Sequence, residues 1–167
     1  MSHPLVLGLF DTPSAAATAA RDLRALGIPR QRVSIVARTH DEEGSLATAA
    51  DATPGSELED SRFAGRLGEL SAHLLAAVAI AMPGIGPVVA DGPLAAGLGE
   101  AAGHAGGGFI RTLESVGLPR AEAQRCQRAV AAGSVLVAAH VDTDHAPSAR
   151  DVLLRAGAPR VFEGTWR

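Results

Sequence analysis

The sequence has no lysine, asparagine or tyrosine, and only one of its 167 residues is a cysteine. A single cysteine excludes an intramolecular disulfide and any metal site built from several thiolates. Aromatic residues make up only 3% of the chain, so the stacked rings that bind bases and sugars are scarce. The net charge of −3 at pH 7 offers no basic surface to nucleic acid. We therefore expect no nucleic-acid partner.

A secretion signal is also missing from the start of the sequence, because no basic segment and no long apolar stretch precede the first strand-like run. The lone thiol, Cys126, is most simply explained as a small apolar side chain on a helix in a reducing compartment. With 47% hydrophobic residues the chain is long enough to bury one core, which predicts a single domain over residues 1–167. The expected location is the cytoplasm.

The N-terminal part of the chain has the pattern of a strand, a helix and a second strand. Residues 5–10 are a short apolar run, and Pro13 follows them at a typical helix start. Apolar residues then recur at helical spacing until Gly27 ends the helix. Residues 32–38 alternate in the manner of a half-buried strand. We interpret residues 1–38 as a βαβ unit.

The C-terminal part, residues 119–167, repeats this order after one additional helix. A helix is predicted for residues 119–132, a strand for 134–141, a second helix for 146–155 and a last strand for 160–166. The Asp-Thr pair and the Ala-Arg-Asp string of the first unit both recur in the second. Two such halves predict an α+β protein with a ferredoxin-like, four-stranded sheet whose helices cover one face.

Between the two halves, residues 39–60 have the composition of an acidic, flexible loop. Residues 61–118 are predicted to form an inserted antiparallel helical hairpin rich in glycine and alanine. Its first helix covers residues 62–82, a rigid turn covers 83–87, and the second helix covers 93–107. A bilayer-spanning helix needs about 20 apolar residues, and the uncharged run here is split by prolines. We therefore expect peripheral membrane contact at most.

Small residues line one face of the second predicted helix, where Ala95, Gly99, Gly103 and Gly107 stand four residues apart. Such a face lets another helix approach closely. Two explanations stay open, namely packing within the hairpin and contact with a second copy or with lipid. The candidate interaction surface consists of Pro83, Gly84, Ile85, Gly86, Pro87, Gly99, Gly103 and Gly107.

Two glutamate–histidine pairs are candidate metal ligands. Glu69 and His73 stand four residues apart, as do Glu100 and His104, and an antiparallel hairpin would bring each glutamate level with the opposite histidine. Bundle metal sites are built from such side chains, although the di-iron motif spaces them three apart. The alternative is the polar stripe of an amphipathic helix. No cofactor is expected.

A second polar group follows the strand at 134–141. His140, Asp142, Asp144 and His145 could form a further metal or acid–base cluster. Capping of the next helix by Asp142, Thr143 and Asp144 is the simpler explanation, because these residue types bind free backbone N–H groups at helix starts. No catalytic triad can be named from spacing alone.

Several strings together resemble the bacterial general stress protein 17M-like family. They are LGLFD at residues 7–11, MPGIGPVVA at 82–90, GPLAA at 92–96, VGLP at 116–119 and GSVLV at 133–137. The resemblance covers nearly the whole chain, and the proline–glycine string is its most specific part. It implies a small stress-induced or membrane-associated protein, and it supplies no enzymatic activity or catalytic residues.

Three functions are compared. The first is a non-enzymatic stress-associated protein that acts through self-association, as a homo-oligomer, or through docking of its apolar hairpin on a membrane or protein. The second is a regulatory module that binds a small molecule or a metal, since ferredoxin-like halves often bind ligands where they meet. The third, an enzyme using the histidine and carboxylate clusters, has the least support because no constellation is specific.

Overall fold

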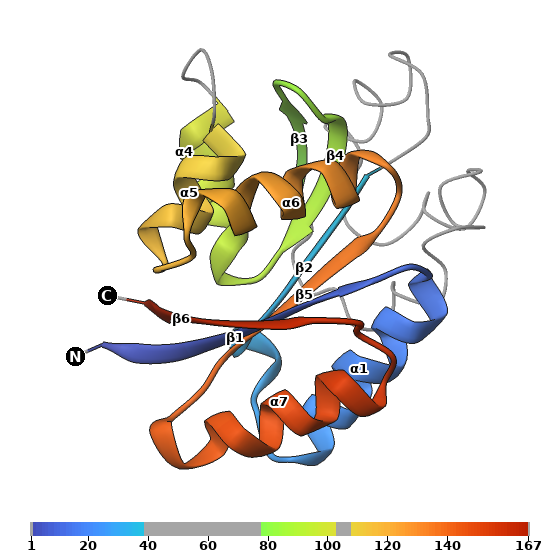
Figure 1. The fold of residues 1–167 in the computed structure, drawn as a ribbon, viewed down its shortest axis with the longest axis vertical. Helices are drawn as coiled ribbons and strands as arrows, with labels where there is room; N and C mark the ends of the chain where they lie inside the picture. Colours follow the sequence, from blue (N-terminus) through green and yellow to red (C-terminus); the bar gives the residue numbers. More distant parts are fainter. Residues whose placement is uncertain (1, 39–77, 103–107, 167) are drawn as a thin grey trace.

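The computed structural model describes residues 2–38, 78–102 and 108–166. These residues form an α+β structure in which one six-stranded sheet lies between two layers of helices (Figure 1). The strands are β1 (His3–Phe10), β2 (Val33–Arg38), β3 (Val78–Met82), β4 (Gly86–Asp91), β5 (Val135–His140) and β6 (Val161–Trp166). The helices are α1 (Pro13–Ala25), α4 (Pro93–Ala102), α5 (Gly108–Ser115), α6 (Arg120–Ala131) and α7 (Ala146–Arg155), with short 3₁₀ helices η1 (Arg30–Arg32) and η2 (Thr143–His145).

Every pair of neighbouring strands is antiparallel, and the order across the sheet is β3-β4-β2-β5-β1-β6. Strands β2, β5, β1 and β6 come from the two ends of the chain, where the sequence predicted four strands. Strands β3 and β4 extend the sheet beyond β2. Within the described residues the sheet therefore has six strands, and the prediction of four is wrong.

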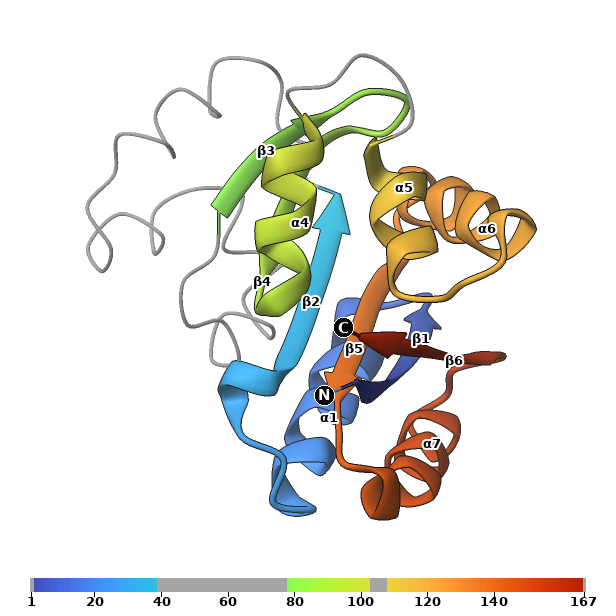
Figure 2. The same ribbon diagram turned by 90° about the vertical axis from the view of Figure 1, so that its left-hand side faces the viewer.

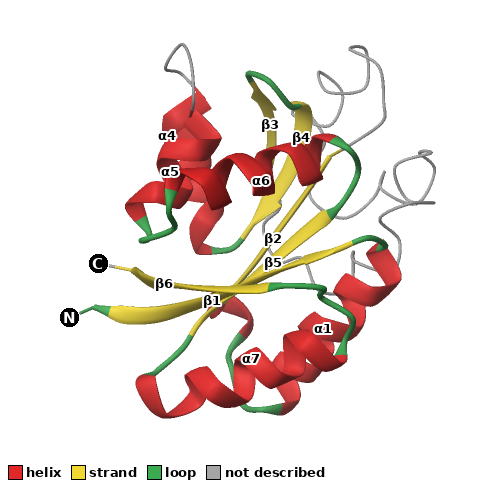
Figure 3. Ribbon diagram, viewed as in Figure 1, coloured by secondary structure: helices red, strands yellow, loops and turns green. Residues whose placement is uncertain are grey.

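The predicted elements at both ends of the chain are confirmed, because their start signals operate as expected. At the start of α1 the Ala15 N–H donates to Oγ1 of Thr12 over 3.2 Å, and Pro13 takes the first helical position. Helices α1 and α7 lie together on one face of the sheet (Figures 1 and 3). They pack on one side of β1 and β5, around fully buried Phe10, Leu23 and Leu153.

Helices α4, α5 and α6 cover the opposite face, with α4 over β2, β3 and β4 and with α5 beside α6 (Figure 2). All six residues of β5 are buried because this central strand is covered on both sides. Val135 and Val137 contribute to the core under α1 and α7, whereas Leu136 and Ala138 contribute to the core under α4 to α6. Both termini of the described chain lie at one side, where His3 pairs with Trp166.

The predicted helical hairpin is wrong over residues 78–91, which form a β-hairpin. β3 and β4 pair antiparallel, and the turn between them covers residues 83–85. Two glycines explain the turn: Gly84 has φ +83° and Gly86 has φ +97°, a left-handed backbone that other residues rarely adopt. Along β3 the side chains alternate, with Ile80 and Met82 buried and their neighbours exposed. The remainder of the first predicted helix, residues 62–77, lies outside the described residues.

The second predicted helix is confirmed from Pro93 to Ala102 as α4, and its expected extension to residue 107 lies outside the described residues. The helix predicted at 119–132 is confirmed as α6, with Pro119 at its N-cap. Helix α5 was not predicted as a separate element. The acidic loop at 39–60 also lies outside the described residues. No helix in the described part of the chain is long and apolar enough to cross a membrane.

Close approach between α4 and α5 depends on glycines other than the predicted ones. A Cβ on Gly97 would lie 3.1 Å from Cγ2 of Thr112, and a Cβ on Gly108 would lie 2.6 Å from the carbonyl oxygen of Ala101. Gly99 is exposed, and no atom of the described residues beyond its own helix would lie within 4 Å of a Cβ placed there. The close approach of α5 is thus made at Gly97 and Ala101, each two residues from Gly99 and therefore on the opposite side of α4.

Candidate functional site

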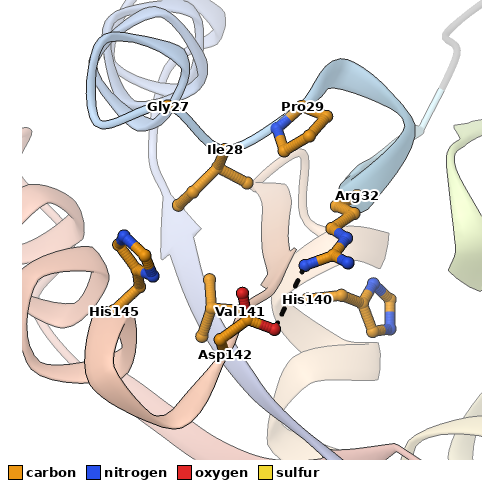
Figure 4. A pocket seen from close by; sticks show the side chains of 8 residues that line it. All are labelled: Gly27, Ile28, Pro29, Arg32, His140, Val141, Asp142 and His145. Atoms are coloured by element: carbon orange, nitrogen blue, oxygen red, sulfur yellow. Dashed lines mark hydrogen bonds and ion pairs between the residues drawn. The ribbon is translucent and has the colours of Figure 1, made fainter.

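A small pocket of about 40 Å³ opens where β5 ends beside the loop that joins α1 to β2. Antiparallel pairing explains the position, because Val33 at the start of β2 lies opposite Ala139 near the end of β5. The chain before β2 and the chain after β5 are thereby brought together. We call this site the Asp142 pocket, and it is lined by Gly27, Ile28, Pro29, Arg32, His140, Val141, Asp142 and His145 (Figure 4).

Asp142 is the electrostatic centre of the pocket. Its Oδ1 accepts a hydrogen bond from Nη1 of Arg32 over 3.3 Å and lies 3.8 Å from Nδ1 of His3. Arg32 and Asp142 are separated by 110 positions in the sequence. Both side chains are about half exposed, and an ion pair of this kind contributes only about 0.2–1 kcal/mol to stability. The pair therefore orients the guanidinium more than it holds the fold together.

His140 is the one buried titratable side chain among the residues that line the pocket, with 7% of its surface exposed. Neither Nδ1 nor Nε2 has a hydrogen-bond partner within the described residues. Its ring meets the ring of Trp166 edge to face, with centroids 4.8 Å apart and planes at 83°. Burial lowers the pKa of His140 below its ordinary value, and this outweighs the opposing effect of the nearby Arg32 backbone, while the basic side chains of His3 and Arg32 act in the same direction as burial. The side chain is therefore held in its neutral form.

The lining combines groups of different chemistry. Ile28 and Val141 are buried and give the pocket an apolar wall, whereas His145 is exposed at the start of α7 (Figure 4). A guanidinium has five N–H donors and matches the geometry of a carboxylate or phosphate. A neutral imidazole offers one donor and one acceptor. The arrangement can therefore bind a small polar molecule.

The sequence-predicted cluster of His140, Asp142, Asp144 and His145 is brought together only in part. Three of these residues line the pocket, and Asp144 does not. The capping interpretation is wrong for Asp142, because this residue stands before η2 without a side-chain capping bond and its carboxylate binds Arg32 instead. Within the described residues no group of three or more potential ligands could hold a metal ion. The cluster is thus a polar pocket.

The other candidate metal ligands do not form a site among the described residues. Glu69, His73 and His104 lie outside them, and Glu100 is an exposed residue of α4. Of the candidate interaction surface, Gly103 and Gly107 also lie outside the described residues. The proline–glycine string forms the β3–β4 turn and the start of β4, where Ile85 is buried in the core under α4 to α6.

Sequence reasoning missed Arg32, Ile28 and His3. The sequence did contain a signal for the position of Arg32. In two interlocked βαβ halves, the start of the strand predicted at 32–38 lies beside the end of the strand predicted at 134–141. That order puts the residue before Val33 next to the residue after Ala139. Comparison with family models, with curated proteins and with solved structures found no match to the chain.

Proposed function

We propose that the protein is a non-enzymatic module that binds the carboxylate end of a small molecule in the Asp142 pocket. The observation that carries this proposal is the position of Arg32, whose guanidinium stands in the pocket and is oriented by Asp142. One guanidinium nitrogen is bound to Asp142, which leaves further N–H donors for a ligand carboxylate. A volume of about 40 Å³ suits a few water-sized groups and is too small for a large cofactor.

We also propose that four of the strands and two of the helices form a ferredoxin-like unit. The order β2-β5-β1-β6, with α1 and α7 on the same face, is what two interlocked βαβ halves produce. In this interpretation β3 and β4 are an added hairpin, and the Asp142 pocket lies where the two halves meet. The resemblance to the general stress protein 17M-like family makes a stress-associated, cytoplasmic role the biological context that we propose.

Amide chemical shifts during titration with acetate or succinate test the binding proposal. We expect saturable shifts at Ile28, Val141 and His145, and no such shifts with ethylamine, a cation of similar size. The shifts should disappear in Arg32→Gln. They should persist in Arg30→Gln, a matched control that removes the same charge from η1 without altering the pocket lining. Equal binding by both variants, or no shifts with either acid, would contradict the proposal.

Self-association is the second candidate function, favoured by the edge of the sheet at β3. Within the described residues this strand pairs only with β4, and Val78 on it is a large hydrophobic side chain with 45% of its surface exposed. An edge strand with exposed apolar residues can pair with a second copy. Light scattering coupled to size exclusion would test this with Val78→Lys, using Leu154→Lys on α7 as the control because Leu154 is 40% exposed. A monomeric wild type would rule this candidate out.

A further inference from the structure

His140 lies where three strands from both ends of the chain meet. It is the last residue of β5, it pairs with Leu5 of β1, and its ring packs against Trp166 near the end of β6. Its two ring nitrogens are buried and lack hydrogen-bond partners among the described residues. A neutral imidazole in such a place leaves its hydrogen-bonding groups unused, and a charged imidazolium there is strongly disfavoured.

The titratable and charged groups around this position are mostly basic side chains. Arg32 of η1 and His3 of β1 approach from the neighbouring elements, and both share the single carboxylate of Asp142. His145 of η2 lines the same pocket. The acidic residue of β6, Glu163, is bound instead to Arg150 of α7 over 3.0 Å. Among the described residues Asp142 is therefore the acidic group nearest to His140 in this pocket, and its carboxylate is already engaged by Arg32 and lies close to His3.

Strand β6 is the part of this junction that is most easily detached. None of its six residues is buried, and it forms the edge of the sheet next to β1. Beyond its pairing with β1, the strand is held by the Thr165 N–H, which donates to the carbonyl oxygen of Val116 over 2.7 Å, and by the bond between Glu163 and Arg150. Phe162 and Trp166 also pack, partly buried, against the core under α4 to α6. Local opening requires less free energy where few apolar contacts must be broken. A charge that appears on His140 can thus reach water by displacing Trp166, without unfolding the core.

We propose that His140 is an acid-sensitive latch for the C-terminal strand: protonation of its imidazole releases Trp166 and the end of β6 from the sheet. The proposal does not require ligand binding in the Asp142 pocket, because it needs only the protonation of His140 and the packing of Trp166 against its ring.

The direction of the pH effect follows from the protonation states. An ordinary histidine has a pKa of about 6.5, and the pKa of His140 in the closed state is lower because the imidazole is buried. In the closed state Trp166 packs against His140, and in the open state Trp166 and the end of β6 have left the sheet and His140 meets water. The open state consequently binds more protons than the closed state below about pH 6.5. The contribution of neutral His140 to the stability of the closed state is complete above that pH, and it decreases as the pH falls toward the lowered pKa.

The single tryptophan makes the test direct, since all indole fluorescence comes from Trp166. Between pH 7.5 and pH 4.5 we expect a red shift of its emission and greater quenching by iodide, while far-ultraviolet circular dichroism keeps its helical signal. His140→Phe keeps an aromatic side chain against Trp166 and cannot be protonated, so the shift should be lost in this variant. His140→Gln provides a second non-titrating side chain in case the phenylalanine does not fit. His145→Gln, at an exposed histidine of the same pocket, should retain the shift.

Three results would overturn the proposal. They are emission that does not change over this pH range in the wild type, a shift that persists unchanged in a folded His140 variant, and loss of the helical signal together with the shift. The last result would mean that acid unfolds the whole protein. Direct titration of the His140 ring by NMR supplies the remaining check, because its midpoint must coincide with the midpoint of the fluorescence change.

Discussion

Replacing Gly99 with alanine should stabilise the protein, and the size of the effect can be worked out from its surroundings. Gly99 is an exposed residue of α4, and a Cβ there would meet no atom of the described residues beyond its own helix within 4 Å. Glycine in a helix interior is less favourable than alanine by about 0.5–1 kcal/mol. Gly99→Ala should therefore raise the free energy of unfolding by about 0.5–1 kcal/mol, because no atom of the described part of the chain crowds the added methyl group.

Two neighbouring glycines of the same helix pair should respond differently. In Gly97→Ala the new methyl group would lie 3.1 Å from Cγ2 of Thr112, so the helix-propensity gain is offset by compression and the net change should be small. In Gly108→Ala the methyl group would lie 2.6 Å from the carbonyl oxygen of Ala101, which belongs to the backbone and cannot turn aside. Overpacking of this kind costs about 1–3 kcal/mol.

Urea and thermal unfolding of the three variants provide the assay. For a chain of this length 1 kcal/mol corresponds to roughly 2–4 °C in Tm, so Gly99→Ala should raise Tm by a few degrees while Gly108→Ala lowers it. If Gly99→Ala instead destabilises as much as Gly108→Ala, the Gly99 face is a close packing seam. That result would refute the packing described for α4 and restore the interpretation of Gly99 as a helix contact.

Three further substitutions or treatments test individual contacts. Ser34→Ala removes the buried oxygen that accepts the Leu94 N–H over 3.0 Å at the start of α4, so urea unfolding should show a loss of about 1–3 kcal/mol, against little change in the exposed control Ser14→Ala. Cys126 is fully buried and its burial raises the pKa of the thiol to about 12, so a disulfide reagent at pH 8 should modify it only after denaturation. Gly92→Ala should greatly reduce the yield of folded protein, because its φ of +83° and its contact with the β2 backbone leave no room for a methyl group.

The helices and strands at the two ends of the chain could be predicted, because the residues that specify each of them lie close together in the sequence. Thr12 and Pro13 mark the start of a helix in any context, and the β-branched residues of segment 33–38 favour a strand. The expectation that this strand is only half buried is wrong, because five of the six residues of β2 are buried between the two helical layers. The β-hairpin could not be distinguished from a helix by periodicity, because residues 78–90, which make up β3, the turn and β4 except Asp91, form a short, uncharged apolar run and such runs fit both structures. Gly84 within the turn and Gly86 directly after it were the signal in favour of a hairpin, since both adopt the positive φ angles that hairpin turns require.

The candidate site was predictable to a lesser degree. His140, Asp142 and His145 are close in the sequence, so spacing alone brought them together, but spacing could not say what Asp142 would bind. Its partner Arg32 is distant in the chain and becomes a neighbour only through the pairing of β2 with β5. The capping prediction for Asp142 considered only residues that are close in the sequence. It failed because the Asp142 carboxylate accepts a hydrogen bond from the charged guanidinium of Arg32 and not from a backbone N–H.

Arg32 takes part in both proposals, because it would bind the ligand and it lies in the pocket that His140 lines. Ligand binding and protonation of His140 are therefore predicted to affect each other. A carboxylate bound to Arg32 would bring a negative charge into the pocket that His140 lines, which favours the protonated imidazole. Acetate should therefore raise the midpoint of the His140 titration, and by linkage acetate should bind more tightly as the pH falls through that midpoint. NMR titration of the His140 ring with and without saturating acetate measures the first effect, and acetate titrations at two pH values measure the second. A midpoint that acetate binding leaves unchanged would show that the ligand lies too far from His140 to affect it, so that the pocket and the latch act independently.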